Sequence, residues 1–395
     1  MVMAGGTGGH VFPALAVADA LRAQGVEVSW LGTRRGLEAD VVPNAGFPID
    51  YIHVSGLRGK GIMRLMTAPV TLLSALYQGL KIMRRRNPSA VLGMGGYVCG
   101  PAGLAAWISR RPLLIHEQNA RAGLTNRLLA PFSKRIMQAF PGTFPANKRV
   151  YYTGNPLRKA FTENPALSAR PQPVNTPLRL LVIGGSLGAA YLNRVVPAAL
   201  AQMKSNERPH VWHQTGKNNI ESATLVYSSL GLLAAREQEN ISPSKDQPSP
   251  HEKKASGKSL VKVKPFIADM AAAYRWADVV LCRSGAMTIA ELAAAGVASI
   301  LVPFPHAVDD HQTANARYLS DAQAALLVPQ EHLNAESLRD ILQSLSAERL
   351  NKMAASASKL ALPKATAQVV QHCLAVARGQ LPGQTPGQHK GTSHG

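Results

Sequence analysis

Short β-rich runs alternate with helical segments in two successive series, and each series opens with a strand that leads into a glycine cluster. The strands expected in the first series are Met1–Ala4, Val26–Leu31, Ile49–Val54, Ala90–Gly93, Leu113–His116, Arg135–Gln138 and Val150–Thr153. Those expected in the second are Leu178–Gly184, His210–Gln214, Leu260–Lys264, Asp278–Cys282, Ser299–Val302 and Ala325–Val328. Apolar strands that alternate with helices are typical of a parallel sheet covered on both faces. The sequence therefore predicts an α/β protein with two such sheets.

Two domains are also what a chain of 395 residues favours. A proline-rich stretch at 155–177 separates the two series and predicts a linker between the domains. The polar segment 237–258 predicts a flexible, dispensable insertion, and the Gly-, Gln- and His-rich tail at 379–395 predicts disorder. Met1–Ala4 is short for a buried strand, so either this strand is clipped or the true start lies upstream.

The charge is strongly basic and unevenly distributed. With 43 Lys and Arg against 23 Asp and Glu, the net charge is +20, which indicates an anionic partner. The stretch from Asp50 to Glu117 holds no carboxylate between its ends, but nine basic residues: Arg58, Lys60, Arg64, Lys81, Arg84, Arg85, Arg86, Arg110 and Arg111. Apolar residues at helical spacing accompany them over Met63–Arg86, where Pro69 favours two short helices over one. This pattern fits either the interface of an anionic bilayer or an ordinary helix with one core face and solvated basic ends.

Three other classes of protein are disfavoured: nucleic-acid-binding, disulfide-stabilised and membrane-spanning proteins. Only Tyr77 offers an aromatic ring for stacking in the basic helical region, which argues against nucleic-acid binding. Cys99, Cys282 and Cys373 are too few and too scattered for a disulfide framework, and we expect reduced, buried thiols. No apolar run reaches the length of a membrane span.

Three glycine clusters follow predicted strands: 5–9, 93–100 and 184–188. Each alone is compatible with a tight turn. A strand–glycine loop–helix junction also presents backbone N–H groups and the positive end of a helix to an anion. No Gly-Lys-Ser/Thr sequence follows the first cluster, so it is not a Walker A motif. Because ligands of open α/β sheets lie at the carboxyl ends of the strands, the clusters together favour an anion-binding cleft.

The segment 283–291 allows two interpretations. Thr288 and Glu291 have the spacing of a helix capping box. Alternatively, the amides at the helix start face a diphosphate and Glu291 accepts hydrogen bonds from a ribose diol. The nearby cluster of His306, Asp309, Asp310, His311, Gln312 and Asn315 is likewise compatible with metal binding or with recognition of sugar hydroxyls.

Together these motifs resemble the MurG family of glycosyltransferases over nearly the whole chain, to about residue 378. The resemblance is carried by GGTGGH at 5–10, SGLRGKG at 55–61, GMGGYVCGP at 93–101, HEQN at 116–119, GNPLR at 154–158, GGSLGA at 184–189, FIADMAAAYRWADVV at 266–280 and CRSGAMTIAELAAAG at 282–296. It implies the GT-B fold, with two Rossmann-like domains facing across a deep cleft. The first domain would span 1–158 and the UDP-GlcNAc-binding domain 159–364, with a helix at about 365–378 packing back on the first. Leu187 and His311 stand where the family commonly has Gln.

The implied activity is transfer of N-acetylglucosamine (GlcNAc) from UDP-GlcNAc to the C4 hydroxyl of the muramyl sugar of lipid I, with inversion, to form lipid II. His10 is the candidate general base, although capping of its loop is an equal alternative. The implied donor-binding residues are Thr7, Gly8, Gly9, Asn119, Arg158, Ser186, Ile267, Ala286, Met287, Thr288, Glu291, His311 and Gln312. The implied acceptor-diphosphate residues are Gly5, Gly6, Gly9, Gly95, Gly96 and Tyr97.

The resemblance also implies the partners. A lipid-linked acceptor places the protein peripherally on the cytoplasmic face of the bacterial inner membrane, docked through Lys60, Arg64, Met66, Leu73, Leu76 and Trp107. Other cell-wall or division proteins are further candidate partners, and nucleic acid is not. No tightly bound cofactor is expected, and a divalent cation accompanying the substrates would not be chelated by the protein. Two alternatives stay open, namely a related UDP-GlcNAc 2-epimerase or glycolipid synthase, and a non-catalytic basic protein that binds nucleic acid.

Overall fold

The structure is a computed structural model that describes residues 1–54, 62–162, 177–185, 188–233 and 260–380, without the side chains of 62–67 and Val308. The chain divides into two compact units, residues 1–162 with 362–395 and residues 163–361. The predicted segments at 55–61 and 237–258, most of the linker and most of the tail lie outside the described residues.

The first unit contains a seven-stranded parallel sheet in the order β3-β2-β1-β4-β5-β6-β7. Its strands are β1 (Val2–Met3), β2 (Trp30–Gly32), β3 (Ile49–Tyr51), β4 (Val91–Gly93), β5 (Leu113–Glu117), β6 (Arg135–Gln138) and β7 (Val150–Tyr152). Its helices are α1 (Gly8–Arg22), α2 (Glu38–Asn44), α3 (Ile62–Arg86), α4 (Cys99–Ile108), α5 (Leu124–Leu129), the 3-10 turn η1 (Ala130–Phe132), α6 (Lys159–Thr162) and α15 (Ala365–Ala377).

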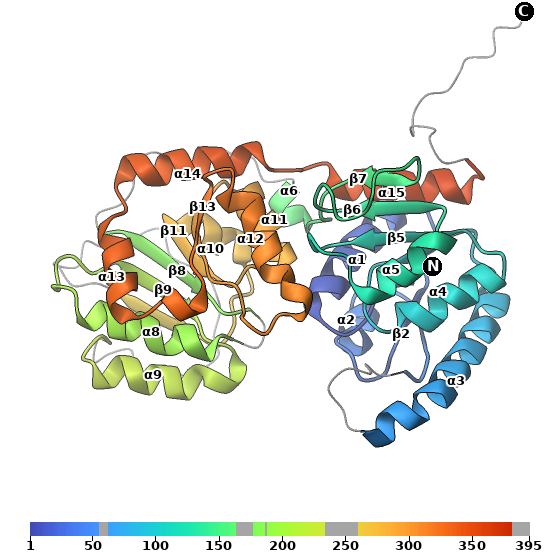
Figure 1. Cartoon of the computed structure of the whole chain (residues 1–395), viewed down its shortest axis with the longest axis horizontal. Coiled ribbons are helices and arrows are strands. Elements are labelled where there is room, and N and C mark those ends of the chain that lie inside the picture. Colours follow the sequence, from blue (N-terminus) through green and yellow to red (C-terminus); the bar gives the residue numbers. More distant parts are fainter. Residues whose placement is uncertain (55–61, 163–176, 186–187, 234–259, 381–395) are drawn as a thin grey trace, which may run out of the picture. The chain divides into compact units, whose positions relative to one another are not determined.

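Helices cover both faces of this sheet, as the buried strands require (Figure 1). Successive strand residues point to opposite faces: Leu114 packs in the layer of α1, α2 and α15, whereas Leu113 and Ile115 pack in the layer of α3, α4 and α5. The last helix, α15, contributes Val369 and Val370 to the first of these cores and packs against α1.

The second unit repeats the plan with a six-stranded parallel sheet in the order β10-β9-β8-β11-β12-β13. Its strands are β8 (Arg179–Ile183), β9 (His210–Gln214), β10 (Val261–Lys264), β11 (Val279–Cys282), β12 (Ala298–Leu301) and β13 (Ala325–Leu327). Its helices are α8 (Ala190–Ala201), η2 (Lys217–Asn219), α9 (Ile220–Ser229), α10 (Met270–Trp276), α11 (Ala286–Ala295), η4 (Val308–Asp310), α12 (His311–Ser320), η5 (Gln330–His332), α13 (Ala335–Gln343) and α14 (Ala347–Lys359).

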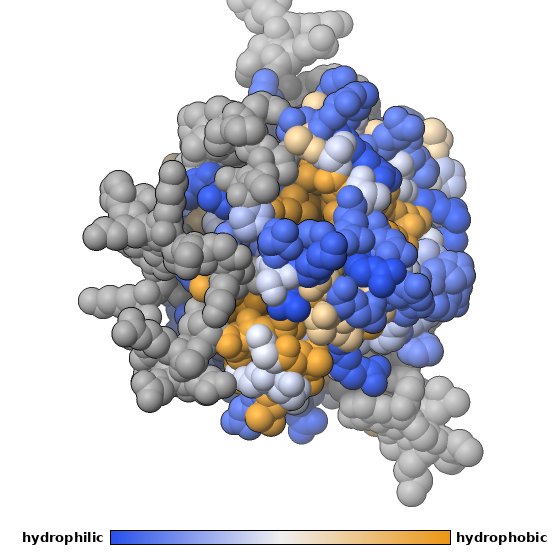
Figure 2. Space-filling view, turned by 90° about the vertical axis from the view of Figure 1, so that its left-hand side faces the viewer, coloured by the Kyte–Doolittle hydropathy of each residue, from blue (hydrophilic) through white to orange (hydrophobic). Residues whose placement is uncertain are grey.

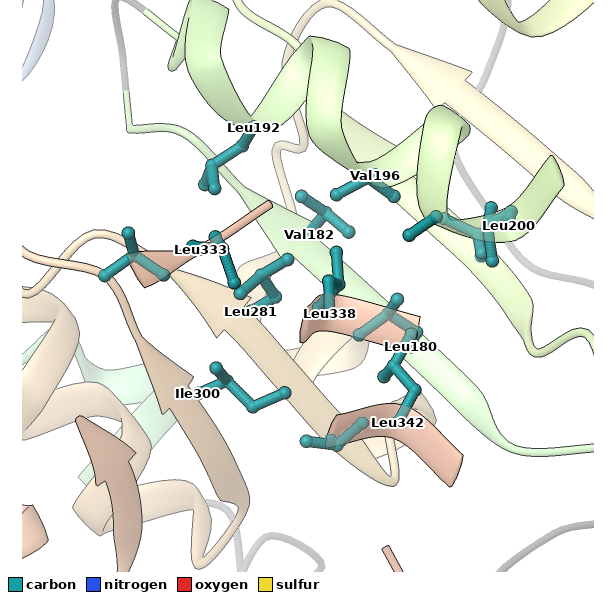
Figure 3. Close-up of a cluster of buried hydrophobic side chains, with 14 of the residues drawn as sticks. Leu180, Val182, Leu192, Val196, Leu200, Leu281, Ile300, Leu333, Leu338 and Leu342 are labelled. Carbon is teal, nitrogen blue, oxygen red and sulfur yellow. The ribbon is translucent and has the colours of Figure 1, made fainter. Parts of the chain in front are cut away.

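The core of the second unit lies between its sheet and the helices α8 and α13. Figure 3 shows Leu180 and Val182 of β8 meeting Leu192, Val196 and Leu200 of α8, with Leu338 and Leu342 of α13 closing the cluster. Figure 2 looks at the side where α9 and α13 lie in Figure 1, and hydrophobic patches there are interspersed among hydrophilic residues.

Every predicted strand is confirmed, and the two parallel sheets with them. The largest shift is at β2, which was predicted from Val26 and begins at Trp30. Its neighbour β1 offers only Val2 and Met3, which pair with Trp30 and Leu31, so the earlier residues have no strand to join.

The prediction of two short helices around Pro69 is wrong. A single helix, α3, runs from Ile62 to Arg86 with Pro69 inside it. Because Pro69 is exposed, water can hydrate the carbonyl that the proline ring leaves without a helical donor. The three cysteines are free and buried, as predicted, and burial raises the pKa of Cys99 and of Cys373 to about 12.

Candidate functional site

Each sheet has one place where the strand order reverses, between β1 and β4 in the first unit and between β8 and β11 in the second. Ligands of open α/β sheets bind beside the carboxyl ends of the strands at such a point. Four loops leave the carboxyl ends of β1, β4, β8 and β11. They are the three glycine clusters and the segment 283–285. They open α1, α4, α8 and α11, and none of these helices carries an acidic residue in its first turn, within the residues that the structure describes. Their positive ends therefore face no carboxylate of their own helix.

In the first unit the two glycine loops touch. A Cβ on Gly96 would lie 2.3 Å from the carbonyl oxygen of Gly5, and a Cβ on Gly6 would lie 3.5 Å from the ring of Tyr97. Gly96 also has φ +87°, a backbone conformation that side chains disfavour. The structure thus brings together the predicted acceptor-diphosphate residues from both loops.

His10 lies in the first turn of α1 and faces the second loop. A Cβ on Gly95 would meet its Cδ2 at 2.6 Å and its Nε2 at 2.9 Å, so only glycine leaves room for the imidazole. Gly8 and Gly9 belong to the same helical turn, and the side chain of the N-cap residue Thr7 makes no capping hydrogen bond.

The amide of Gly6 has a protein acceptor. It donates to Oε2 of Glu38 at 2.9 Å, so it is already committed inside the loop rather than turned to a ligand. The amide of His10 is also committed, because it donates to the carbonyl of Thr7 at 3.1 Å. The amides of Gly8 and Gly9, the first two residues of α1, therefore remain as the candidate donors for an anion.

The carboxyl end of β5 holds a buried polar cluster. Nε2 of His116 donates to the carbonyl of Gly154 at 2.9 Å, and its Nδ1 accepts from Nε2 of Gln118 at 3.1 Å. Burial lowers the pKa of His116 to about 4, so the ring is neutral at pH 7. Oε1 of Glu117 accepts from the backbone amide and from Nδ2 of Asn119, both at 3.1 Å, which fixes this predicted sugar-contacting side chain.

Arg158 is exposed in the first unit. Its guanidinium carbon lies 5.9 Å from the ring centroid of Phe12, next to the start of α1, and 5.7 Å from that of Phe161. Two rings beside the guanidinium hold it partly oriented, as a contact with a diphosphate requires.

In the second unit, the β8–α8 loop is held against the end of β9. Gln214 donates to the carbonyl of Gly185 at 3.2 Å, and a Cβ on Gly188 would lie 2.0 Å from the carbonyl of Thr215. Ser186 and Leu187, which the sequence assigned to this loop, lie outside the described residues.

The capping-box interpretation of 283–291 is wrong. The N-cap of α11 is Gly285, and no side chain caps the helix, because Thr288 already lies inside the first turn beside Ala286 and Met287. Glu291 instead accepts a hydrogen bond from the hydroxyl of Tyr274 on α10, at 3.1 Å. The carboxylate is therefore oriented from a neighbouring helix.

The other predicted donor-site residues follow β10 and β12 at the same edge of the sheet. Ile267 is buried beside the half-exposed Phe266, and Oε1 of Gln312 accepts from the amide of Phe304 at 2.9 Å. Asp309 and Asp310, just before His311 opens α12, both have positive φ, +54° and +49°. Among the described residues no group of His, Cys, Asp and Glu has the arrangement of a metal site.

Sequence reasoning missed two residues of this unit. Arg283 donates to the carbonyls of Val302 and Pro303, each at 3.1 Å, and so fixes the loop after β12. Tyr274, which orients Glu291, was the other. Both residues lie inside the motifs at 266–280 and 282–296, but their contacts are with residues distant in sequence, so no local pattern predicts them.

The predicted membrane residues separate into three groups. Lys60 lies outside the described residues, as do the side chains of Arg64 and Met66. Leu73 and Trp107 are exposed, as a docking surface needs. Leu76 is half-buried and packs against the core beneath α3.

The exposed apolar residues of the first unit continue beyond these. Val70 and Tyr77 join Leu73 on α3, Leu124 and Leu128 lie one turn apart on α5, and Phe132 packs on Trp107 with ring centroids 4.8 Å apart. Of the helices that the structure describes, none is long and apolar enough to cross a bilayer.

Comparison with known proteins agrees with this geometry. Residues 1–138 match the glycosyltransferase family 28 N-terminal domain, and residues 179–370 match the glycosyltransferase family 28 C-terminal domain. A curated relative from Nitrosococcus oceani is 50% identical over 381 residues, which cover 96% of this chain and 99% of the relative. One from Alkalilimnicola ehrlichii is 50% identical over 380 residues, with 96% and 99% covered. Both are named UDP-N-acetylglucosamine–N-acetylmuramyl-(pentapeptide) pyrophosphoryl-undecaprenol N-acetylglucosamine transferase.

Solved structures give the same result. The crystal structure of MurG from Acinetobacter baumannii is 39% identical and superposes with a TM-score of 0.75, covering 95% of this chain and 98% of its own. A putative UDP-N-acetylglucosamine 2-epimerase from Listeria monocytogenes superposes with a TM-score of 0.62 over 98% of both chains, but at 15% identity the likeness concerns the fold alone. The predicted GT-B fold with two Rossmann-like units is confirmed.

Proposed function

Because the chain belongs to glycosyltransferase family 28, and within it to the MurG transferases, we propose that it moves GlcNAc from UDP-GlcNAc to the muramyl sugar of lipid I, which forms lipid II. The observation that carries this proposal is the paired architecture. Each unit has glycine-lined junctions at its switch point, and each junction opens a helix whose first turn lacks acidic residues, within the described residues. Two diphosphates, one in the donor and one in the acceptor, are the anions that such a pair of sites would take.

The second unit is proposed to bind the donor. The amides at the start of α11, from Ala286 to Thr288, would hold the diphosphate. Glu291 would accept hydrogen bonds from the ribose diol, with Tyr274 holding its carboxylate in place. The backbone of Ile267 would contact uracil, and His311 and Gln312 would contact the sugar.

The first unit is proposed to bind the acceptor, with Gly9, Gly95, Gly96 and Tyr97 around its diphosphate. His10 would act as general base on the C4 hydroxyl, since an imidazole titrates near neutral pH and its ring lies directly against Gly95. Attack on the anomeric carbon, with UDP as the leaving group, is a single displacement with inversion. Positioning and stabilisation of the leaving diphosphate would supply most of the rate.

We further propose that the first unit docks on an anionic bilayer, at the cytoplasmic face of the inner membrane. Residues 51–162 contain 17 Lys and Arg but one carboxylate, Glu117. Glu117 is buried and committed to hydrogen bonds with its own loop. The charged side chains that α3 and α5 carry are therefore all basic, as are Arg110 and Arg111 after α4, although Asp50 of β3 pairs with Arg85 and Arg86 at the end of α3. Exposed apolar residues with basic neighbours are the composition that an anionic lipid surface attracts.

A transfer assay tests the activity. Radiolabelled UDP-GlcNAc and a lipid I analogue are incubated with the wild type and with His10→Ala, and labelled lipid product is counted. Wild-type transfer that falls by at least a hundredfold in His10→Ala supports the proposal and the role of the base. Full activity in His10→Ala removes that role, and no transfer by the wild type removes the proposed function.

A further inference from the structure

Glu38 is a buried carboxylate that the mechanism above does not use. It is the first residue of α2, and its side chain is completely shielded from solvent. It accepts three hydrogen bonds: from the amide of Gly6 at 2.9 Å, from the amide of Thr33 at 2.9 Å and from the hydroxyl of Thr33 at 2.8 Å. A buried carboxylate is retained only where such bonds compensate for its lost hydration.

The surrounding backbone leaves room for this carboxylate by means of three glycines. A Cβ on Gly5 would lie 2.6 Å from Oε1, one on Gly32 would lie 2.7 Å from Cγ, and one on Gly36 would lie 2.0 Å from Oε2 of Glu38. Real Cβ contacts are not so short, so a side chain at any of the three would displace the carboxylate. The loops after β1 and β2 are thus built around Glu38.

The loop after β4 joins the same cluster through Thr33, which follows β2. Its hydroxyl donates to Glu38, and the hydroxyl of Tyr97 lies 3.4 Å from it in the loop after β4. That loop also contacts the first one directly where Gly96 meets Gly5. Glu38 therefore connects the loops that follow three adjacent strands, β2, β1 and β4.

We propose that Glu38 is a positioning residue for the acceptor. By holding the amide of Gly6, it sets the path of the chain into Thr7 and the first turn of α1, and with them the place of His10 relative to Gly95. Glu38 touches neither substrate, since it is buried beneath the loop. The inference rests on the proposed function, because it assigns the acceptor to these loops.

The expected size of the effect follows from the geometry. In Glu38→Gln the carboxamide presents an NH₂ group where the carboxylate accepts hydrogen bonds, so one donor of Gly6 or Thr33 faces another donor. The loop must then shift, and misplacement of a reacting group by about 1 Å costs on the order of a hundredfold in rate. Thr33→Val keeps the shape of the side chain and removes one of the three bonds, so it should act in the same direction with a smaller effect.

The experiment separates positioning from a loss of fold. The kcat and KM for a lipid I analogue are measured for wild type, Glu38→Gln and Thr33→Val, together with the Kd for UDP-GlcNAc by calorimetry and unfolding in urea. Asp50→Asn is the matched control. Asp50 is also buried in the first unit, but it lies on β3 and pairs with Arg85 and with Arg86 (Nε–Oδ2 2.7 Å) at the end of α3.

We expect kcat/KM for the acceptor to fall about 30- to 100-fold in Glu38→Gln and about three- to tenfold in Thr33→Val. The Kd for UDP-GlcNAc should stay within twofold, and Asp50→Asn should lose stability but keep its acceptor kinetics. Wild-type acceptor kinetics in both variants overturns the proposal. The proposal is also overturned if donor binding and acceptor turnover fall together, in proportion to the fraction of the variant that is folded. The absence of transfer by the wild-type protein would instead remove the proposed function.

Discussion

The guanidinium of Arg135 donates a hydrogen bond of 2.6 Å to Nδ1 of His372 and so joins β6 to α15 across 237 positions of the sequence. Both side chains are buried, and the ring of Tyr151 packs against that of His372 at a tilt of 48°, with centroids 4.3 Å apart. Burial, with the neighbouring charge of Arg135, lowers the pKa of His372 to about 4. The last helix is therefore held on the first unit by a neutral imidazole that accepts from a buried cation.

This arrangement predicts how stability depends on pH. An unfolded histidine has a pKa near 6.5, so between pH 6.5 and the folded pKa of about 4 the unfolded chain binds the extra proton. The contribution of His372 to stability is therefore complete above pH 6.5 and is lost as the pH falls towards 4. At pH 5 the loss should be about 2 kcal/mol relative to pH 7.

The measurement compares wild type with His372→Gln, whose carboxamide oxygen can still accept from Arg135. Urea unfolding at pH 7 and pH 5 should show a decrease in the free energy of unfolding that is about 2 kcal/mol smaller in the variant. His116 and His213, whose pKa values burial lowers to about 4 and about 3, are present in both proteins and cancel. Equal decreases in the two proteins would contradict the assignment.

Glu291 should govern the affinity for the nucleotide. Glu291→Gln keeps the size of the side chain but offers one acceptor oxygen in place of two, so the KM for UDP-GlcNAc should rise about 10- to 100-fold while the acceptor KM stays unchanged. Tyr274→Phe leaves Glu291 intact and removes the hydroxyl that orients it, so a rise of about threefold is expected. Glu348→Gln, an exposed exchange on α14, is the control. A donor KM that is unchanged in Glu291→Gln would rule out the ribose contact.

Replacing Gly96 should destabilise the protein both through backbone strain and through a clash between the two glycine loops, and a second glycine separates the two effects. Gly96 and Gly142 both have positive φ, +87° and +79°, but a Cβ on Gly142 meets nothing within 4 Å. Gly142→Ala should lower the free energy of unfolding by about 1–2 kcal/mol, from backbone strain alone. Gly96→Ala also places a methyl group against the carbonyl of Gly5. It should therefore lower the free energy of unfolding by about 3 kcal/mol or more and remove most of the activity. Equal costs in urea unfolding would show that the loops do not meet as described.

The sequence was most informative where a local pattern decides the structure. Alternating apolar runs and glycine clusters located all the strands and the junctions of both sheets, because these depend on neighbours in sequence. The start of β2 was predicted too early because its length depends on β1, which is remote in sequence. Pro69 was expected to end a helix, but at an exposed position its missing hydrogen bond can be replaced by water.

The site was less predictable, because its supporting contacts are tertiary. Motifs drew attention to His10 and Glu291, which the structure places in α1 and α11, the helices that follow two of the loops. The hydroxyl of Tyr274, however, reaches Glu291 from another helix. Glu38 lies in none of the motifs and interacts with Gly6, 32 positions away. On α3, helical spacing could not show that Leu73 is exposed while Leu76 packs partly against the core, since apolar residues occupy both sides of that helix.

Docking on lipid should depend on leucines that the fold leaves outside. Leu73 on α3 and Leu128 on α5 are exposed at 66% and 63%, so replacing both with Ser removes apolar surface without opening a cavity in the core. Each leucine that enters the interface contributes about 1–2 kcal/mol, which predicts a loss of at least tenfold in partition to vesicles of anionic lipid. Leu225→Ser is the matched control, because Leu225 is 69% exposed on α9 in the second unit. Sedimentation with the vesicles at low and high salt measures both contributions, since the basic residues respond to salt and the leucines do not. Equal binding of the double variant and the control would place the contact with lipid elsewhere on the protein.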